Sequence, residues 1–389
     1  MRKMYLNLLT SVLAIGAISP VLAQDSIKVG LVMPMTGVLG QVGRQAVAGA
    51  RLYVEQHGDT VAGRKIEFIV RDDGSIPDNA KRIAQELITT GNVAILGGGL
   101  TPSVLAMAPL ATESKTPTVV MVSGTSIVTE RSPYFVRTSW THAQQASVLA
   151  NWAARNGSKR VTIIASDWAP GHEAAGVFAK NFTSAGGEIV ETLKVPLANP
   201  DFAPFLQRAR DSAPDTLFVF VPAPQAAVLS KQFVERGMDK AGIRLIGPGD
   251  ITDDEELPGM NDAMIGTVTA GFYSPNHPTP INRDYLAAFH KANPQMAPNF
   301  ISVSGYDGMH LIYEALKKTA GNAGGDALIA AMKGTSWESP RGPMTIDPAT
   351  RDVVHNIYIR RVEKIEGVLT NREFETFVAV ADPSKLANK

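Results

Sequence analysis

The chain has 389 residues, of which 44% are hydrophobic, and it carries 37 basic and 37 acidic side chains. This neutral balance argues against a basic surface for nucleic acid, so we expect no nucleic-acid partner. Cysteine is absent, which excludes disulfides, thiolate metal sites, a cysteine nucleophile and a lipid anchor on cysteine. A chain of this length exceeds the usual size of a single hydrophobic core and predicts two lobes.

Residues 1–23 predict a secretory signal peptide. Basic residues follow Met1, a mostly apolar run extends from Leu6 to Ile18, and small residues precede a cleavage point after Ala23. The apolar run has about 13 residues, whereas a membrane-spanning helix needs about 20. We expect an exported chain without a lipid anchor to reside in the periplasm, with secretion into the medium as the alternative.

Four alternations of strand and helix are predicted before Arg137. Short runs rich in β-branched residues indicate the strands, and apolar residues at helical spacing indicate the helices. The predicted strands are 27–32, 65–70, 93–96 and 118–122. The predicted helices are 41–56, 78–89 and a segment that follows Ser103 and ends near Ser114.

Residues 160–238 predict three more strand and helix units. The strands are expected at 161–165, 187–195 and 216–221, with a further strand at 244–246. The helices are expected at 173–185, 202–212 and 223–237. After Gly271, the pattern predicts helices at 282–292, 303–318 and 326–332, strands at 343–346 and 356–361, and then a tail.

This alternation predicts an α/β protein of two Rossmann-like lobes. We assign 24–139 and 271–346 to the N-terminal lobe, and 140–270 and 347–380 to the C-terminal lobe. The chain would then cross between the lobes near Ser139, Gly271 and Asp347. A multi-crossing hinge of this kind permits closure over a ligand.

Two strand ends of the first lobe carry hydroxyl and glycine residues. Ligands of doubly wound sheets bind at such ends, and the helix that opens near Thr101 favours an anion at its N-terminus. Pro102 stands where a dinucleotide motif needs its last glycine, and no Walker lysine follows. Hydroxyls of Thr101, Ser123 and Thr125 could therefore converge with the backbone at Gly124 on a carboxylate. A plain turn with a helix cap is the alternative for each segment.

The second lobe offers an aromatic residue and an acid at its strand ends. Trp168 lies in a turn beside Pro170, where stacking on a ligand is favoured over a place in the core. Asp250 follows the strand 244–246 and joins Asp167 as an acid near a strand end, with helix capping as the alternative for Asp250.

The sequence disfavours an enzyme. His172 and Glu173 begin a zinc-protease pattern, but Gly176 stands where the second histidine is needed, and the remaining histidines lack ligand spacing. No nucleophile elbow accompanies a strand. We therefore predict neither catalytic residues nor a metal or other cofactor.

Several short motifs occur in a specific order along nearly the whole chain after the signal peptide. They are IKVGLVMPMTG at 27–37, the helix with Gly49-Ala50, the Asp72-Asp73 pair, the glycines 97–99, the turn 123–125, FAPFL at 202–206 and GYD at 305–307. In this order they resemble the periplasmic solute-binding proteins of ABC importers, in the branched-chain amino acid group. The resemblance implies the type I periplasmic binding fold and a small carboxylate ligand that is delivered to the permease subunits in the membrane. We expect a monomer.

The resemblance also implies ligand contacts. In that family, hydroxyls and backbone N–H groups of the first lobe hold the ligand carboxylate, and the matching positions are Thr101, Ser123 and Thr125. Val42 and Gly43, in the loop after the first strand, would line the same side.

Two departures from the family pattern bear on the ligand. Pro170 stands where a tyrosine usually precedes the glycine of the first turn in the second lobe. Gly249 stands where a glutamate usually pairs with the ligand ammonium, and the acid is displaced to Asp250. An unpaired buried ammonium costs several kcal/mol, so these changes disfavour an amino acid unless Asp250 reaches it.

The turn DWAPG at 167–171 and the segment FVFVP ending at Pro222 instead resemble the branch of the family that takes up aromatic acids, such as benzoate or hydroxycinnamate derivatives. We therefore expect Pro170 and Pro222 to contact the ligand, together with Trp168. We therefore predict an aromatic or other amine-free organic acid as ligand, with a branched-chain amino acid as the second candidate. A ligand-sensing receptor component without transport is the alternative function.

Overall fold

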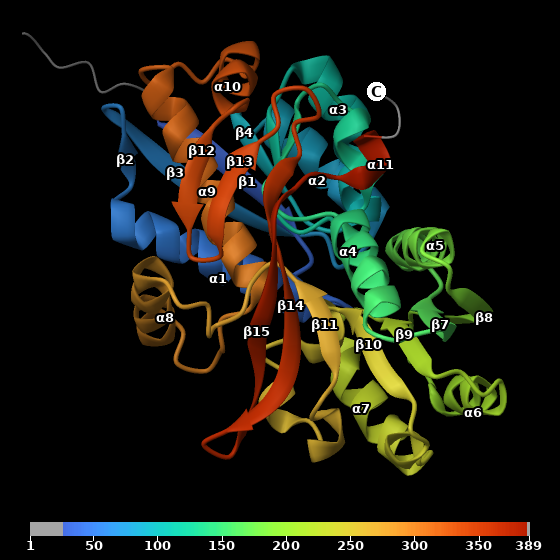
Figure 1. Cartoon of the computed structure of the whole chain (residues 1–389). Helices are drawn as coiled ribbons and strands as arrows, with labels where there is room; N and C mark the ends of the chain where they lie inside the picture. Colours follow the sequence, from blue (N-terminus) through green and yellow to red (C-terminus); the bar gives the residue numbers. More distant parts are fainter. Residues whose placement is uncertain (1–25, 387–389) are drawn as a thin grey trace, which may run out of the picture.

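The computed structural model describes residues 26–386, so the predicted signal peptide lies outside the described residues. Within them the chain forms two α/β lobes, each built on one sheet (Figure 1). The predicted fold class, two Rossmann-like lobes joined by several crossings, is confirmed.

The first lobe contains a six-stranded sheet in the order β2-β3-β1-β4-β5-β6. All neighbours are parallel except β2 and β3. The strands are β1 (Ile27–Met33), β2 (Thr60–Val61), β3 (Arg64–Asp72), β4 (Ile95–Gly98), β5 (Thr118–Val120) and β6 (Phe135–Arg137). The predicted strand 93–96 begins two residues later than expected. The strands β2 and β6 were not predicted, because two or three residues are too few to display a period.

Helices from both halves of the sequence cover this sheet. They are α1 (Gly40–His57), α2 (Pro77–Thr89), α3 (Thr101–Ser114), α8 (Pro280–Ala292), α9 (Phe300–Lys318) and α10 (Gly325–Met332). Helix α1 crosses α9 at close range because each carries a glycine there. A Cβ on Gly49 would lie 1.8 Å from the carbonyl oxygen of Ser302, and one on Gly305 would lie 2.0 Å from that of Ala46.

The second sheet has nine strands in the order β12-β13-β14-β11-β10-β9-β7-β8, with β15 paired to β14. Its β12 and β13 end lies beside α9 and α10 of the first lobe, and the remainder forms the second lobe (Figure 1). The strands are β7 (Arg160–Ser166), β8 (Glu188–Val195), β9 (Thr216–Phe220), β10 (Arg244–Pro248), β11 (Val268–Gly271), β12 (Ser336–Ser339), β13 (Gly342–Ile346), β14 (Val353–Ile365) and β15 (Val368–Val380). The strands β8, β7, β9, β10 and β11 run parallel, and the later strands are antiparallel. The strand and helix alternation predicted β7, β8, β9 and β10, whereas β11 and β12, of four residues each, were not predicted.

The remaining helices are α4 (His142–Arg155), α5 (Ala169–Ser184), α6 (Ala203–Asp211), α7 (Ala226–Glu235) and α11 (Pro383–Leu386). Short 3-10 helices lie at Ser126–Glu130, Ala223–Gln225, Met238–Lys240, Gly249–Thr252, Leu257–Gly259 and Asp262–Met264. Helix α4 was not predicted, although Thr141 and Gln144 form a capping box at its start. That motif was the signal in the sequence that could have found it.

The prediction of a tail after Arg361 was wrong. Strand β14 continues to Ile365, and β15 returns along it as the second arm of a long hairpin (Figure 1). Glu366 and Gly367 form the turn with φ values of 50° and 84°. Two adjacent positive φ values are typical of the two-residue turns that join antiparallel strands.

The three crossings between the lobes converge on aromatic residues. Trp140, which follows β6, stacks on Phe272, which follows β11, with ring centroids 5.2 Å apart. Phe272 in turn lies 5.1 Å from the ring of His355 in β14. The third crossing lies between β13 and β14, which pair with each other as antiparallel neighbours in one sheet. The exact division of the chain at 139, 271 and 346 stays a prediction.

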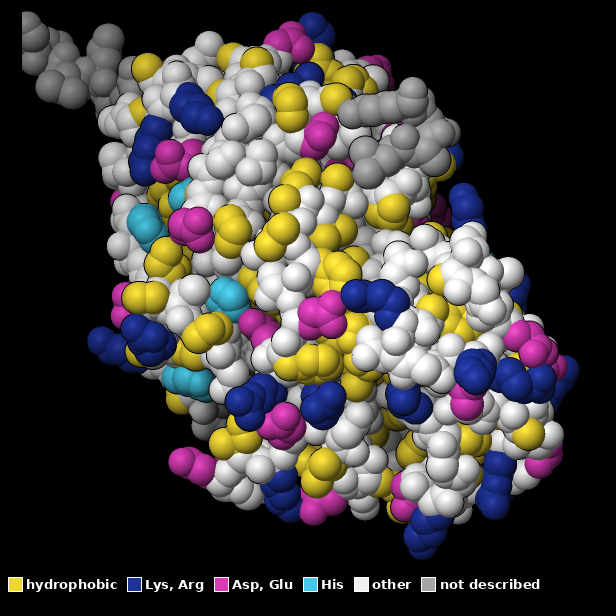
Figure 2. All heavy atoms as spheres, viewed as in Figure 1, with side chains coloured by type: hydrophobic (Ala, Val, Ile, Leu, Met, Phe, Trp, Pro, Cys, Tyr) yellow, Lys and Arg dark blue, Asp and Glu magenta, His cyan; other side chains and the backbone are white. Residues whose placement is uncertain are grey.

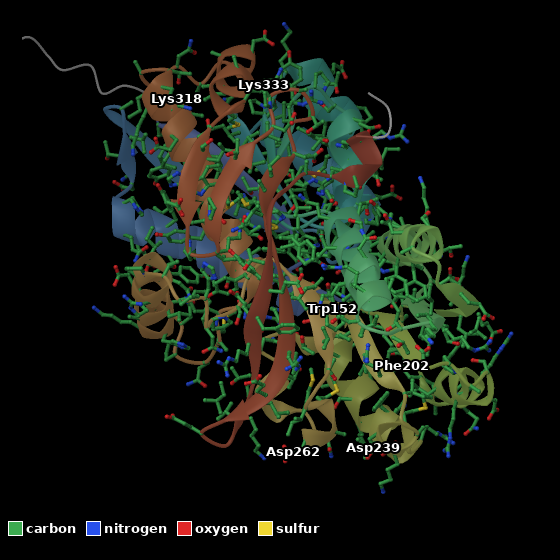
Figure 3. The ribbon with its side chains drawn as sticks, viewed as in Figure 1. Trp152, Phe202, Asp239, Asp262, Lys318 and Lys333 are labelled. Atoms are coloured by element: carbon green, nitrogen blue, oxygen red, sulfur yellow. The ribbon has the colours of Figure 1, made fainter. Side chains whose placement is uncertain are left out.

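One hydrophobic core continues through both lobes, and smaller cores lie on the other faces of the sheets. Phe202 is fully buried in the second-lobe core, while Lys318 and Asp262 lie at opposite ends of the molecule (Figure 3). Basic and acidic side chains are interspersed over the face in Figure 2. Within residues 26–386 no helix combines the length and the apolar character that crossing a membrane requires.

Candidate functional site

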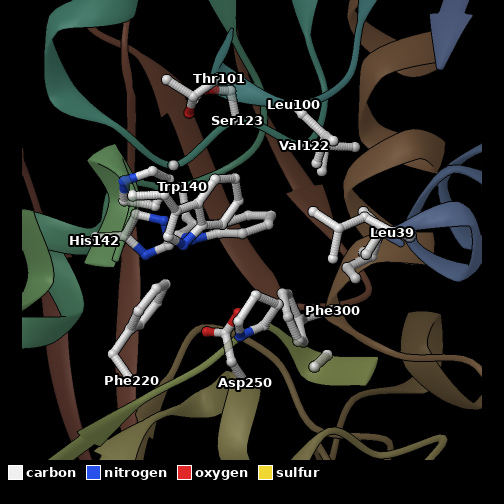
Figure 4. Close-up of a pocket in the computed structure, with 17 residues that line it drawn as sticks. Leu39, Leu100, Thr101, Val122, Ser123, Trp140, His142, Phe220, Asp250 and Phe300 are labelled. Atoms are coloured by element: carbon white, nitrogen blue, oxygen red, sulfur yellow. Dashed lines mark hydrogen bonds between the residues drawn. The ribbon is translucent and has the colours of Figure 1, made fainter. Parts of the chain in front are cut away.

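A cavity lies between the lobes, where strands of both sheets end (Figure 4). The space inside it, together with its open mouth, is about 450 Å³. Its wall is mostly apolar and consists of Leu39, Val42, Leu100, Thr101, Val122, Ser123, Gly124, Trp140, His142, Trp168, Pro170, Phe220, Pro222, Ala223, Asp250, Phe300 and Ile301.

Three hydroxyl groups cluster on the first-lobe side of the cavity. Thr101, the first residue of α3, follows β4, and Ser123 follows β5, so adjacent strands bring their side chains together. The Thr101 Oγ1 atom lies 2.6 Å from Ser123 Oγ and 3.0 Å from Thr125 Oγ1. Thr101 and Ser123 line the cavity, whereas Thr125 does not line it and contacts Thr101. These hydroxyls and the N-terminus of α3 make this wall suitable for an anion.

Arg137 holds the loop with these hydroxyls in place. Its guanidinium is fully buried and donates to the carbonyl oxygen of Ser123, and also to those of Thr125, at 2.6 Å, and Trp140, at 3.0 Å. Its Nε donates to Asp352 in the loop before β14 at 2.7 Å. The arginine therefore connects the anion wall to the crossings between the lobes.

Gly124 allows two rings to approach the hydroxyl cluster. A Cβ at this position would lie 2.5 Å from His142 Nε2 and 2.7 Å from Trp140 Nε1. Trp140 Nε1 is a buried donor without a partner among residues 26–386. Burial, together with the positive charge of Arg137, lowers the pKa of His142 to about 3. The imidazole is therefore neutral at physiological pH.

Aromatic rings from distant parts of the chain form the remaining walls. Trp168 and Pro170 follow β7, Phe220 ends β9, and Phe300 begins α9. Trp140 contacts Phe300 edge to face at 5.1 Å between centroids. Flat apolar surfaces on several sides suit a planar ligand.

The two acids of the second lobe have different environments. Asp250 lies in the 3-10 helix after β10, is only 6% exposed and lines the cavity. Burial raises the pKa of Asp250 to about 7 against the opposing charge of Arg360. Asp167 is exposed and pairs with His172 at 2.6 Å, so it turns away from the cavity.

Eight of the ten predicted ligand-binding residues line the cavity, namely Val42, Thr101, Ser123, Gly124, Trp168, Pro170, Pro222 and Asp250. Thr125 and Gly43 do not. Gly43 packs on the turn after β1, since its Cβ would lie 2.2 Å from the carbonyl oxygen of Pro34. Val42 and Gly43 belong to helix α1, as the predicted helix 41–56 had it, and not to the loop that the resemblance implied.

Sequence reasoning missed several wall residues, above all Trp140, His142, Phe220 and Phe300. Phe220 falls in a predicted strand, and its place at the strand end was a usable signal. Phe300 comes from a helix far along the chain, and only the folded chain brings it to the cavity.

Hydrogen bonds join the lobes on both sides of the cavity. The Gln41 side chain in α1 donates to Glu255 and Glu256 of the second lobe, at 2.7 Å each. On the other side, Glu173 in α5 accepts from the backbone N–H of Ser126 at 2.9 Å. These bonds stabilise the present arrangement of the lobes, so they contribute to affinity for a ligand that prefers this arrangement.

We expect Gln41→Ala to weaken ligand binding about three- to tenfold. The variant loses two bonds to carboxylates, and a loss of about 1 kcal/mol corresponds to this range. Calorimetric titration measures the change in Kd, and Gln207→Ala on exposed α6 is a matched control that should leave it unaltered. An unchanged Kd for Gln41→Ala would show that this contact does not contribute to closure.

Within residues 26–386, no group of three or more acidic or histidine side chains is placed to hold a metal ion.

Residues 26–367 match the family model described as "Periplasmic binding protein". A solute-binding protein of an ABC transporter from Rhodopseudomonas palustris BisB5, solved with 3,4-dihydroxybenzoic acid, is 57% identical over 93% of this chain and 100% of its own, with a TM-score of 0.91. Another from R. palustris, solved with 4-hydroxybenzoate, is 39% identical over 93% and 100% of the two chains, with a TM-score of 0.90.

The name of a curated relative refers to different ligands. The "Leu/Ile/Val-binding protein homolog 6" of Brucella suis is 38% identical over 365 residues, which are 92% of this chain and 93% of that protein. Both the family match and these relatives extend over nearly all of the described residues. The chain therefore belongs to the periplasmic binding protein family.

Proposed function

We propose that this protein is the solute-binding component of an ABC importer and that its ligand is an aromatic carboxylate. It would act as a monomer in the periplasm, close its lobes over the acid and deliver it to the permease subunits. In this role the protein binds its ligand without transforming it. The relatives solved with hydroxylated benzoic acids support the ligand class.

The cavity itself carries the proposal. An anion wall with the hydroxyls of Thr101 and Ser123 faces a slot lined by the rings of Trp140, Trp168 and Phe300. A flat acid can place its carboxylate on that wall and its ring between the aromatic side chains. Hydrogen bonds to a charged group contribute about 1.5 to 3 kcal/mol each, so three of them approach the 8 kcal/mol of a micromolar complex.

A branched-chain amino acid is the second candidate, because the relative from Brucella suis is named for such ligands. Its ammonium would need an acidic partner close to the carboxylate wall. Gly249 stands at the position where the family pattern has that acid, and Asp250 lies across the cavity from Thr101 and Ser123 (Figure 4). This arrangement favours an acid without an amine.

Thermal shift followed by calorimetry tests the ligand class. The purified mature chain, unfolded and refolded to release any bound compound, is titrated with leucine, benzoate, 4-hydroxybenzoate, coumarate and a short keto acid. We expect binding of at least one aromatic acid in the micromolar range or tighter. Tight binding of leucine with no response to the aromatic acids would refute the proposal.

The anion wall predicts unequal effects for two hydroxyls. Ser123→Ala should weaken binding of the best acid about tenfold or more, because a bond to the carboxylate contributes about 1.5 kcal/mol or more. Thr125→Ala should have a smaller effect, because Thr125 reaches the ligand only through Thr101. Titration of both variants measures the difference, and equal affinities would mean that the carboxylate binds elsewhere.

A further inference from the structure

The cavity has a second polar pole, opposite the anion wall. Figure 4 shows Asp250 extending its carboxylate into the cavity from one side, while Thr101 and Ser123 lie on the other. The walls between the two poles are mostly aromatic and aliphatic, with Trp140, Trp168, Phe220 and Phe300 among them. A ligand that spans this cavity therefore meets hydrogen-bonding groups at its two ends.

One oxygen of the Asp250 carboxyl group lacks a donor. Its Oδ2 atom is buried and has no hydrogen-bond partner among residues 26–386. The nearby guanidinium of Arg360 is committed elsewhere, since it donates to the carbonyl oxygens of Tyr273, at 2.6 Å, and Gly249, at 3.3 Å. Buried polar groups of folded proteins are almost always paired, so an unpaired carboxylate that faces a cavity indicates a donor on the ligand.

The donor that fits this position is a hydroxyl group. A second carboxylate on the ligand would be repelled by Asp250. The ammonium of an α-amino acid is attached to the carbon next to its carboxylate, so it would stay near Ser123 when the carboxylate is bound there. A hydroxyl on the ring, remote from the carboxylate, is carried across the apolar slot to Asp250.

We propose that Asp250 accepts a hydrogen bond from a ring hydroxyl of the ligand and thereby makes the protein selective for hydroxylated aromatic acids, with the hydroxyl remote from the carboxylate. This assignment rests on the proposed function and specifies the ligand of the same site. Asp250 is then a specificity-determining residue, and the carboxylate wall of the first lobe sets the orientation of the acid.

The test compares three acids of similar shape: 4-hydroxybenzoate, 4-methylbenzoate and benzoate. The methyl group fills about the same space as the hydroxyl but cannot donate. We expect the unmodified protein to bind 4-hydroxybenzoate at least tenfold more tightly than either of the other acids, as measured by calorimetry. That ratio is the scale of one hydrogen bond to an ionised carboxylate, so the titrations are done at about pH 8, above the Asp250 pKa of about 7.

Two variants separate selectivity from general binding. Asp250→Ala should reduce affinity for 4-hydroxybenzoate at least tenfold and leave benzoate within about threefold. Asp250→Asn keeps the shape of the side chain and a neutral acceptor, so its affinity for 4-hydroxybenzoate should lie between those of the alanine variant and the unmodified protein. It also tests the proposal if the alanine variant does not fold. Asp167→Ala, an exposed acid of the same lobe, should leave the ratio between the acids unaltered.

The outcomes that overturn the assignment are distinct from those that overturn the proposed function. Equal losses for benzoate and 4-hydroxybenzoate in Asp250→Asn, or equal binding of 4-methylbenzoate and 4-hydroxybenzoate by the unmodified protein, would refute the role of Asp250 alone. Failure of the unmodified protein to bind any aromatic acid would refute the proposed function, and this assignment with it.

Discussion

Arg137→Met should lower the free energy of unfolding by about 3 kcal/mol or more, the scale expected when one partner of a buried ion pair is removed. The side chains of Arg137 and Asp352 are 0% and 2% exposed. Asp352 keeps Lys385 as a partner, which places the loss near the lower end of the range. The carbonyl oxygens of Ser123, Thr125 and Trp140 each lose a donor as well.

Chemical denaturation measures this effect, and ligand titration measures its consequence for the site. Arg160→Met is the matched control, because the Arg160 side chain is 47% exposed and its pair with Glu188 lies on the surface. Exposed pairs contribute about 0 to 1 kcal/mol, so the control should be nearly as stable as the unmodified protein. If the two variants were equally stable, Arg137 would not organise the anion wall.

Gly124→Ala should weaken ligand binding about tenfold to a hundredfold. The added Cβ would overlap the rings of His142 and Trp140, at 2.5 and 2.7 Å from their nitrogens. Overpacking a tight site costs about 1 to 3 kcal/mol, and here the rings can move only by narrowing the cavity or disturbing the contact between Trp140 and Phe272. Calorimetry with the best aromatic acid measures the loss.

Gly176→Ala is the control for this substitution. Gly176 lies in α5, and a Cβ there would meet no heavy atom within 4 Å. The control should bind normally and gain about 0.5 to 1 kcal/mol in stability, because alanine is the better helix residue. Normal affinity in Gly124→Ala would contradict the position of the two rings described here.

Predictions from the sequence held where the information is local. Strand and helix periodicity placed most elements, including most of the parallel strands of both lobes, because burial of one face imposes a period on neighbouring residues. The predictions failed at short strands such as β6 and β11. They also failed at β15, where Glu366 and Gly367 form a turn that the prediction overlooked, and at α4, whose capping box was not recognised.

The candidate site likewise contains residues that the sequence located and residues whose position depends on the fold. Thr101, Ser123, Trp168 and Asp250 directly follow predicted strands, and the carboxyl ends of parallel strands meet at one edge of a sheet. Thr125 comes from the same loop as Ser123, but its hydroxyl points to Thr101 and away from the cavity wall. A side chain's direction within a loop depends on its contacts, which the sequence does not display.

The sequence by itself determined the α/β class, the two lobes, the family resemblance and the strand ends at which a carboxylate would bind, because each of these is encoded in short segments. Only the tertiary structure decided that Trp140, His142 and Phe300 complete the cavity and that Asp250, which lines it, keeps one carboxyl oxygen without a partner among residues 26–386. These features depend on contacts between segments far apart in the chain, which form only when the crossings bring the two lobes together.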